Sequence, residues 1–316
     1  MSSWQKCLSP RQAAAWLWVL SLCVAALLLS CAVACTPKRA HPDQLGSKAP
    51  RVVSLSPGIT ESMLVLGAAP QLIGASDYCL LPSDLKPPRV GSALTPNYEA
   101  IARLKPDLIV ATDVAGTQLL PLSKLARTVS LPWLELDQVI TSLHKLGELL
   151  GQPQKGQALA ARMSQALSVA VPENAPRVLW ILDLGDSGSN ETWFVRDNSL
   201  HGAVLRAAGA RNAVDHPVEG LPKLSAEELL VINPSVILTI LARPHLGAEE
   251  IRRETQRIEL HFKRFAPLTA VKQQRLLVLH HPGAMNLGPS VLELIPLIKS
   301  ALADSVPPLP SHGKRP

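Results

Sequence analysis

Two stretches of this chain repeat one another in register, one over residues 97–110 and the other over residues 225–238. Each opens on a helix-capping residue, Asn97 or Ser225, and carries a glutamate two places later. Each then follows a two-turn helical pattern, reaches a proline and enters a β-branched segment of the kind that forms a buried strand. A chain that repeats a helix–strand unit predicts two similar lobes, and the cleft between such lobes is a natural site for a small molecule.

Short β-branched runs and helical patterns alternate on both sides of a helical middle section. We expect strands over residues 51–55, 72–75, 108–112, 178–182, 236–240 and 276–279. A first helix over residues 59–66 ends at Gly67, and the middle section predicts helices over residues 137–150 and 154–171. This alternation predicts an α/β fold of two similar lobes with mainly parallel sheets, joined by a long backbone helix.

The two lobes open on matching sequences, residues 50–53 and residues 176–179. We therefore expect an N-terminal lobe, a linking backbone helix and a C-terminal lobe, preceded by a signal peptide and a tether and followed by a disordered tail. Their expected bounds are 1–35 for the signal peptide, 36–49 for the tether, 50–150 for the first lobe, 151–175 for the linking helix, 176–303 for the second lobe and 304–316 for the tail.

The N-terminus predicts export. Lys6 and Arg11 precede an apolar run over residues 13–34, which is the layout of a secretory signal. Two cysteines at the end of this run, Cys31 and Cys35, both lie in sequences that look like bacterial lipoboxes. We favour Cys35 as the lipidated residue because the apolar run ends there, although Cys31 has the better upstream leucine. The alternative is an uncleaved membrane anchor, because about 20 apolar residues span a bilayer.

Several classes of function find no support in the sequence. The net charge of +6 is spread along the chain, and no nucleic-acid recognition motif accompanies it. Walker-type phosphate loops, nucleophile elbows and zinc-protease helices are missing. Gly185–Ser189 lacks nucleotide-binding spacing, and we interpret it as a mobile loop that faces a ligand. Cleavage before Cys35 leaves Cys79 as the only unmodified thiol, so a disulfide framework is excluded.

Three segments carry a resemblance to a known family. Residues 51–67, residues 74–78 and residues 98–109 are similar, in order and spacing, to the substrate-binding proteins of ABC importers for cobalamin, haem and ferric siderophores. The resemblance covers about residues 50–303. It implies a class III periplasmic binding protein, with two lobes on a rigid helical backbone that closes only slightly on its ligand.

The resemblance also implies partners and a location. In this family a glutamate on each lobe docks onto arginines of the membrane permease, and the matching positions are Glu99 and Glu227. Glu228 fits a capping box with Ser225, which leaves Glu227 free to face outward. We expect a non-enzymatic lipoprotein at the periplasm or outer face of the cytoplasmic membrane. It has no intrinsic cofactor and delivers a chelate that contains cobalt or iron to an ABC permease and its ATPase.

Candidate ligand contacts follow the expected strands. Tyr78 and Trp193 offer aromatic faces to a large flat ligand, and we expect Trp193 in a loop after the first strand of the second lobe. Arg196 and Arg243 follow second-lobe strands and can pair with ligand carboxylates. The tryptophans that cobalamin binders of this family carry before each docking motif are missing here, which disfavours cobalamin specifically.

His281 and Met285 lie in a segment that we expect at the mouth of the cleft, where either side chain can ligate a haem or corrinoid metal. His280 and His281 are adjacent on an extended chain, so at most one of the two faces the ligand. Two alternatives stay open. One is a binder of bare Zn or Mn ions, which needs three or four converging ligands. The other is a surface sensor or enzyme that reuses the fold.

Overall fold

The computed structural model describes residues 49–112, 119–184, 191–216, 218 and 221–305. The expected signal peptide with Cys31 and Cys35, almost all of the tether, the Gly185–Ser189 loop and residues 306–316 of the tail lie outside the described residues. The described residues belong to one compact unit of the chain, which begins at Ala49.

The first lobe is built on a parallel sheet in the order β2-β1-β3-β4. Its strands are β1 (Val52–Ser54), β2 (Leu72–Ala75), β3 (Leu108–Thr112) and β4 (Arg127–Leu131). Its helices are α2 (Pro57–Val65), η1 (Ala69–Gln71), α3 (Tyr98–Leu104) and α4 (Leu119–Ser123). The expected first helix is confirmed. It begins with a proline in its first turn, and Gly67 follows it in the left-handed conformation that favours glycine.

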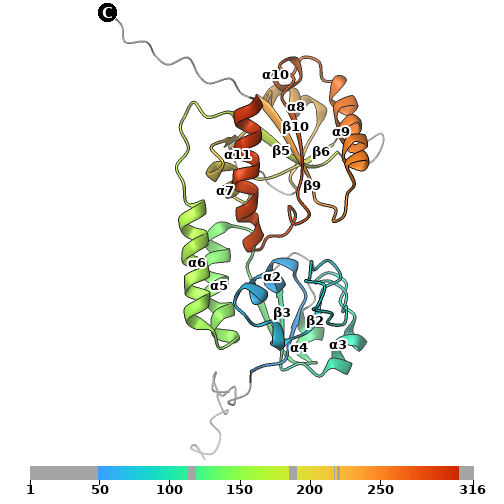
Figure 1. The fold of residues 1–316 in the computed structure, drawn as a ribbon, viewed down its shortest axis with the longest axis vertical. Helices are drawn as coiled ribbons and strands as arrows, with labels where there is room; N and C mark the ends of the chain where they lie inside the picture. Colours follow the sequence, from blue (N-terminus) through green and yellow to red (C-terminus); the bar gives the residue numbers. More distant parts are fainter. Residues whose placement is uncertain (1–48, 113–118, 185–190, 217, 219–220, 306–316) are drawn as a thin grey trace, which may run out of the picture. The chain divides into compact units, whose positions relative to one another are not determined.

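Two helices follow the first lobe, α5 (Leu136–Leu149) and α6 (Pro153–Leu167), and they pack against each other (Figure 1). A Cβ atom added at Gly156 would lie 2.8 Å from the Cα of Gly147, so at this point the backbones of the two helices are in direct contact. Helix α6 ends before the predicted Val171. Ser168, Val169 and Ala170 are exposed, so no buried contact holds a further turn, and Pro172 disfavours helical geometry at the residue before it.

The second lobe has a mixed sheet in the order β10-β9-β5-β6-β8, with β7 also paired to β5. Strands β5, β7, β9 and β10 are parallel, whereas β6 and β8 add an antiparallel edge, so the prediction of mainly parallel sheets is confirmed. The strands are β5 (Arg177–Asp183), β6 (Thr192–Phe194), β7 (Arg211–Asn212), β8 (Lys223–Leu224), β9 (Val236–Leu241) and β10 (Leu276–His280). The helices are α7 (Leu200–Ala207), α8 (Ala226–Ile232), α9 (Ala248–Lys263), α10 (Thr269–Lys272), η2 (Pro289–Glu293) and α11 (Leu294–Ser305).

Alternate residues of β5 enter two different cores. Trp180 packs in a core that also holds residues of α5, α6 and α11, whereas Ile181 packs in a core with Phe262 of α9. Helices α11 and α9 accordingly lie on opposite sides of the strands (Figure 1). The first of these cores runs from the first lobe through the helix pair into the second lobe, and it ties the described parts together by apolar burial.

The sequence repeat is also a structural repeat. Helices α3 and α8 are each capped by the predicted residue, since Asn97 accepts a hydrogen bond from the Ala100 amide and Ser225 accepts one from the Glu228 amide. Both helices end at a residue in the left-handed conformation. The strand openings that match in sequence also make matching hydrogen bonds, through Arg51 and Arg177.

The guanidinium of Arg51 donates to the carbonyl of Leu104 at 2.7 Å, and that of Arg177 donates to the carbonyl of Ile232 at 3.1 Å. Each arginine therefore satisfies a carbonyl at the C-terminal end of the repeated helix.

Candidate functional site

The carboxyl ends of the parallel strands β5 and β9 border a cavity of about 430 Å³ that α9 closes on one side. The ends of parallel strands at such an edge are where α/β folds place their ligands. The cavity is lined mainly by aliphatic side chains, among them Leu182, Leu241 and Ala242, together with Arg243 and Met285. The structure therefore brings together two of the residues that the sequence offered as ligand contacts.

A charged cluster forms the polar side of this cavity. Glu254 of α9 accepts a hydrogen bond from Arg243 at 2.7 Å and another from Arg257 at 2.9 Å. Burial opposes ionisation of Glu254, but these two guanidinium groups outweigh it and lower the pKa of the carboxyl. Glu254 thus stays ionised at neutral pH, and it holds the Arg243 guanidinium in place at the rim.

Thr239 of β9 adds a neutral polar group to the same cavity. Its hydroxyl oxygen is buried and has no hydrogen-bond partner within the described part of the chain. Buried hydroxyls are normally paired, so the unpaired hydroxyl of Thr239 is an exception in the wall of this cavity. No sequence pattern distinguishes Thr239, which lies inside a run of apolar residues. Glu254 is equally inconspicuous in the sequence, because it resembles the other charges of a solvated helix.

Met285 lies on a segment that the structure holds at three places. The Ala284 carbonyl is 2.7 Å from His201 Nε2, and the Leu287 carbonyl accepts from the indole of Trp133 at 2.5 Å. Ser290 donates through its amide and its hydroxyl to Glu61 of α2. Trp133 and Glu61 belong to the first lobe, so this segment is fixed from both lobes while the Met285 side chain stays half-exposed.

His281 is already engaged within the protein. Its Nε2 lies 3.1 Å from a carboxylate oxygen of Glu293, while His280 places its Nε2 2.9 Å from the Arg243 carbonyl. The two rings therefore have different partners, as expected for neighbours on an extended chain. No group of three or more His, Cys, Asp or Glu side chains comes together as a metal site in the described residues.

Trp193 lies in a strand, so the prediction that it occupies a loop is wrong. It is the middle residue of β6 and pairs with Lys223 of β8, whose Nζ lies 4.9 Å from the centre of the indole ring. The same Nζ is 2.6 Å from Glu191. A three-residue strand gives too short an alternating pattern to be recognised in the sequence, and its antiparallel edge position departs from the βα alternation.

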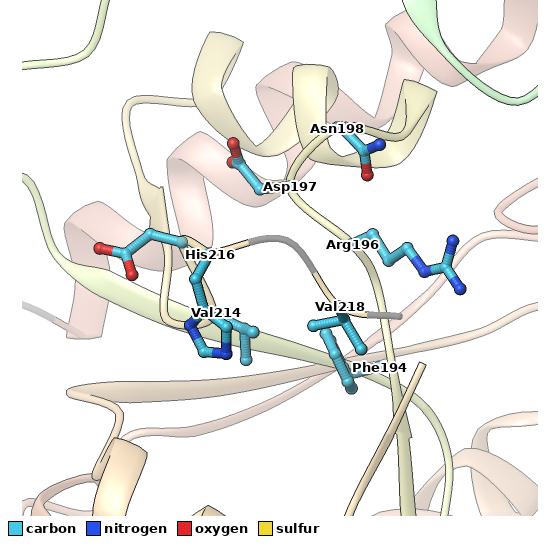
Figure 2. Close-up of a pocket in the computed structure, with 8 residues that line it drawn as sticks. Phe194, Arg196, Asp197, Asn198, Val214, His216 and Val218 are labelled. Carbon is cyan, nitrogen blue, oxygen red and sulfur yellow. The ribbon is translucent and has the colours of Figure 1, made fainter. Parts of the chain in front are cut away.

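Arg196 lines a second, smaller cavity of about 170 Å³, together with Asp197, His216 and Val218 (Figure 2). This volume is below the roughly 300 Å³ at which ligand pockets usually begin. In Figure 2 the Arg196 guanidinium points away from the His216 ring. Arg196 lines this smaller cavity and Arg243 lines the larger one, so the structure does not bring the two arginines together.

Tyr78 follows β2 in the first lobe and is 73% exposed, without a ring contact in the described residues. Cys79 beside it is buried, donates to Thr60 at 3.1 Å and is a free thiol. Burial raises the pKa of this thiol, so Cys79 is not a reactive nucleophile at neutral pH.

The two expected docking glutamates are exposed on the repeated helices. Glu99 lies in the first turn of α3 and Glu227 in the first turn of α8, and both face away from the buried residue of their helix. The capping box of Ser225 and Glu228 is confirmed, and hydrogen bonds from the backbone and the side chain of Ser225 lower the pKa of the exposed Glu228 carboxyl. In the described residues, no helix combines the length and the apolar character that a bilayer crossing requires.

Comparisons with known proteins agree with this architecture. The family described as periplasmic binding protein matches residues 52–282. A vitamin B12-binding protein of Salmonella choleraesuis is 28% identical over 196 residues, which covers 60% of this chain and 72% of that protein. A cobalamin-binding protein of Halobacterium salinarum is 30% identical over 218 residues, which covers 65% of this chain and 57% of that longer protein.

Solved structures share the fold. A periplasmic heme-binding protein from Pseudomonas aeruginosa is 26% identical with a TM-score of 0.63, covering 83% of this chain and 95% of that chain. The periplasmic vitamin B12 binding protein of Vibrio cholerae is 24% identical with a TM-score of 0.60, covering 81% of this chain and 98% of that chain.

Proposed function

The chain belongs to the periplasmic binding protein family, a family of binding proteins rather than of enzymes, and from that premise we propose that it is the substrate-binding component of an ABC importer for a metal tetrapyrrole. Cobalamin and heme, which the names of its relatives mention, are both metal-centred macrocycles with a broad apolar face and polar groups at the rim. The proposal is narrower than the sequence expectation, which also included ferric siderophores.

The observation that carries this proposal is the cavity beside Arg243 and Met285. Its aliphatic walls suit an apolar face, and the Arg243 guanidinium at its rim suits a carboxylate, phosphate or amide oxygen of the ligand. Binding to such a surface needs burial and orientation but no chemical step.

Met285 is the candidate axial contact to the metal. Its thioether is half-exposed at the cavity, whereas the His281 ring is paired with Glu293. Thioether sulfur is an axial ligand of haem iron in other proteins. In this proposal Met285 approaches the metal, and His281 positions the segment that carries it.

Visible absorption titration tests the proposal. The chain from residue 36 onward is mixed with haemin, cyanocobalamin and a ferric siderophore in turn, since its compact unit begins at Ala49. A saturable spectral change at one equivalent of haemin or cyanocobalamin is expected. Saturable binding of the siderophore alone would contradict the tetrapyrrole proposal, and absence of binding to all three would contradict chelate transport.

Delivery to a permease is the second part of the proposal. Glu99 and Glu227 are exposed on repeated helices, at the positions that match the family's docking glutamates. Replacing both by arginine reverses the charge offered to a basic permease surface. Loss of ligand uptake by cells, with ligand affinity unchanged in vitro, is expected. Normal uptake by the double variant would show that these glutamates do not dock.

Attachment to the outer face of the cytoplasmic membrane is the third part. The apolar run before Cys35 supports export, and lipidation of Cys35, or of Cys31, would tether the lobes through residues 36–49. Metabolic labelling with a radioactive fatty acid tests this in Cys35→Ser and Cys31→Ser variants. The variant that loses the label identifies the lipidated cysteine. If both single variants keep the label, neither Cys31 nor Cys35 is the only lipidation site.

A further inference from the structure

The two repeated helices present different outward faces, although their sequences align in register. In α3, Ile101 is buried, and Glu99 and Arg103 lie on the opposite side of the helix. In α8, Leu229 is buried in the same position, and Glu227 and Val231 lie on the opposite side. Val231 therefore occupies in α8 the position that Arg103 occupies in α3.

This single difference changes the state of the neighbouring glutamate. Glu99 forms an ion pair with Arg103 at 3.0 Å, one helical turn away. Glu227 takes part in no ion pair within the part of the chain that the structure describes. Its carboxylate is therefore available to an external cation without first losing an internal one.

Val231 is also unusually open for an aliphatic residue. It is 84% exposed, and Leu230 beside it is partly exposed as well. A single exposed aliphatic side chain needs no explanation, but here two of them adjoin an unpaired carboxylate on one helix face. A carboxylate next to an aliphatic patch is complementary to a guanidinium or ammonium group that has an aliphatic neighbour.

We propose that α8 is the principal docking helix, on which Glu227 binds a basic side chain of the permease while Val231 packs against an aliphatic side chain beside it. This inference rests on the proposed delivery of ligand to a permease. On α3, Arg103 competes with the permease for Glu99, so docking there requires the internal ion pair to open. Exposed ion pairs at this spacing are weak, so Arg103 reduces the contribution of Glu99 without abolishing it.

Two substitutions at the same position of the repeat test the proposal. Val231→Arg gives Glu227 the internal partner that Glu99 has, and it places a positive charge where an aliphatic contact is expected. Arg103→Val gives α3 the face that α8 has. Uptake of labelled cyanocobalamin and of haemin is measured at limiting concentration in cells that contain only the full-length variant.

We expect Val231→Arg to lower uptake at least fivefold and Arg103→Val to raise it, with ligand affinity of both purified proteins unchanged. Leu260→Arg is the matched control, because Leu260 is a 67% exposed aliphatic residue on a different helix, α9. Equal uptake by the Val231→Arg and Leu260→Arg variants would overturn the contact at Val231. Unchanged or lower uptake by Arg103→Val would overturn the competition for Glu99.

The Glu99→Arg, Glu227→Arg double variant separates this inference from the proposed function. If the double variant loses uptake while Val231→Arg does not, docking stands and only the role of Val231 is wrong. If the double variant keeps uptake, the docking proposal itself is wrong. A second copy of this chain is the other possible partner for this face, and sedimentation of the wild type and of Val231→Arg tests for it. A wild-type dimer that Val231→Arg dissociates would assign the face to self-association and overturn the proposal.

Discussion

Glu61 accepts hydrogen bonds from both the amide and the hydroxyl of Ser290, although the two residues lie 229 positions apart in the chain. Asn286 approaches the same carboxylate at 3.4 Å, and a Cβ atom added at Gly288 would collide with it. One side chain of α2 in the first lobe therefore fixes the start of η2 in the second lobe. The segment between Ala284 and Ser290, which carries Met285, is consequently positioned by contacts that the sequence order does not reveal.

Glu61 makes stability depend on pH in an unusual direction. Burial raises the pKa of this carboxyl, and the hydrogen bonds from Ser290 and Asn286 only partly offset that effect. The native state then binds more protons than the unfolded state between the two pKa values. The contribution of Glu61 is therefore full below the unfolded pKa, near 4.5, and is lost as pH rises through the folded pKa.

We predict that the unfolding free energy of wild type minus that of Glu61→Gln decreases as pH rises from about 4.5 towards neutrality. Urea unfolding at several pH values measures this difference. Glu148→Gln, at an exposed helix position, is the control. A difference that stays constant with pH would show that Glu61 titrates normally.

His201 responds to pH in the opposite direction. Its ring is buried against Trp180, and desolvation lowers its pKa to about 4, although its contact with the Ala284 carbonyl favours the charged form. The unfolded state binds more protons between pH 6.5 and 4. Its contribution to stability is therefore full above the unfolded pKa and is lost as pH falls through the folded one.

Replacing His201 by Gln retains a donor for Ala284 but removes the titration. We expect wild type to lose stability relative to His201→Gln as pH falls from about 6.5 to 4, measured by thermal or urea unfolding. His144→Gln, at an exposed position of α5, should show no such trend. A pH-independent difference for His201→Gln would contradict the buried neutral imidazole.

Arg243 is predicted to anchor the rim of the ligand. Its loss removes a charge-assisted hydrogen bond, worth about 1.5–3 kcal/mol, and partial exposure of the side chain favours the lower end of that range. We expect Arg243→Ala to weaken binding of the preferred tetrapyrrole by about tenfold, measured by the visible absorption titration. Arg252→Ala removes a similar exposed ion pair on α9 and should leave affinity unchanged. Equal affinities of the wild type and Arg243→Ala would show that Arg243 does not contact the ligand.

The contact between α5 and α6 predicts a large effect from one methyl group. A Cβ atom at Gly156 would lie 2.8 Å from both the Cα of Gly147 and the carbonyl of Leu143. We expect Gly156→Ala to destabilise the protein by about 1–3 kcal/mol in urea unfolding, because backbone atoms cannot move aside as side chains do. Gly247→Ser is the control, since an added Cβ there meets only the Glu250 carboxylate at 3.6 Å. A neutral Gly156→Ala variant would show that the helices can separate.

Regular structure could be predicted from the sequence where local signals agreed. The strands at residues 72–75 and 108–112 were expected with their observed bounds, because buried parallel strands appear as short β-branched runs. The repeat was recognisable because caps, glutamates and prolines recur at fixed spacing. The apolar spacing continues past Leu167 and therefore predicts a longer helix than α6. The residues that follow Leu167 have no core to pack against, so the helix ends there.

The candidate site was only partly predictable. The sequence predicts Arg243 and Met285 as ligand contacts on independent grounds. That they line one cavity depends on the order of the strands, which spacing along the chain does not encode. Thr239 and Glu254 were missed because their roles appear only when β9 and α9 face each other. The Tyr78 and Trp193 contacts and the docking of Glu99 and Glu227 stay predictions.

The backbone contact between Gly147 and Gly156 also limits which substitutions this protein can tolerate during evolution. Most packed positions can drift because a larger side chain on one helix can be balanced by a smaller one on the other. No residue is smaller than glycine, so neither member of this pair has a compensating partner. We expect lineages of this protein to diverge freely in the exposed residues of both helices while these two positions stay as they are.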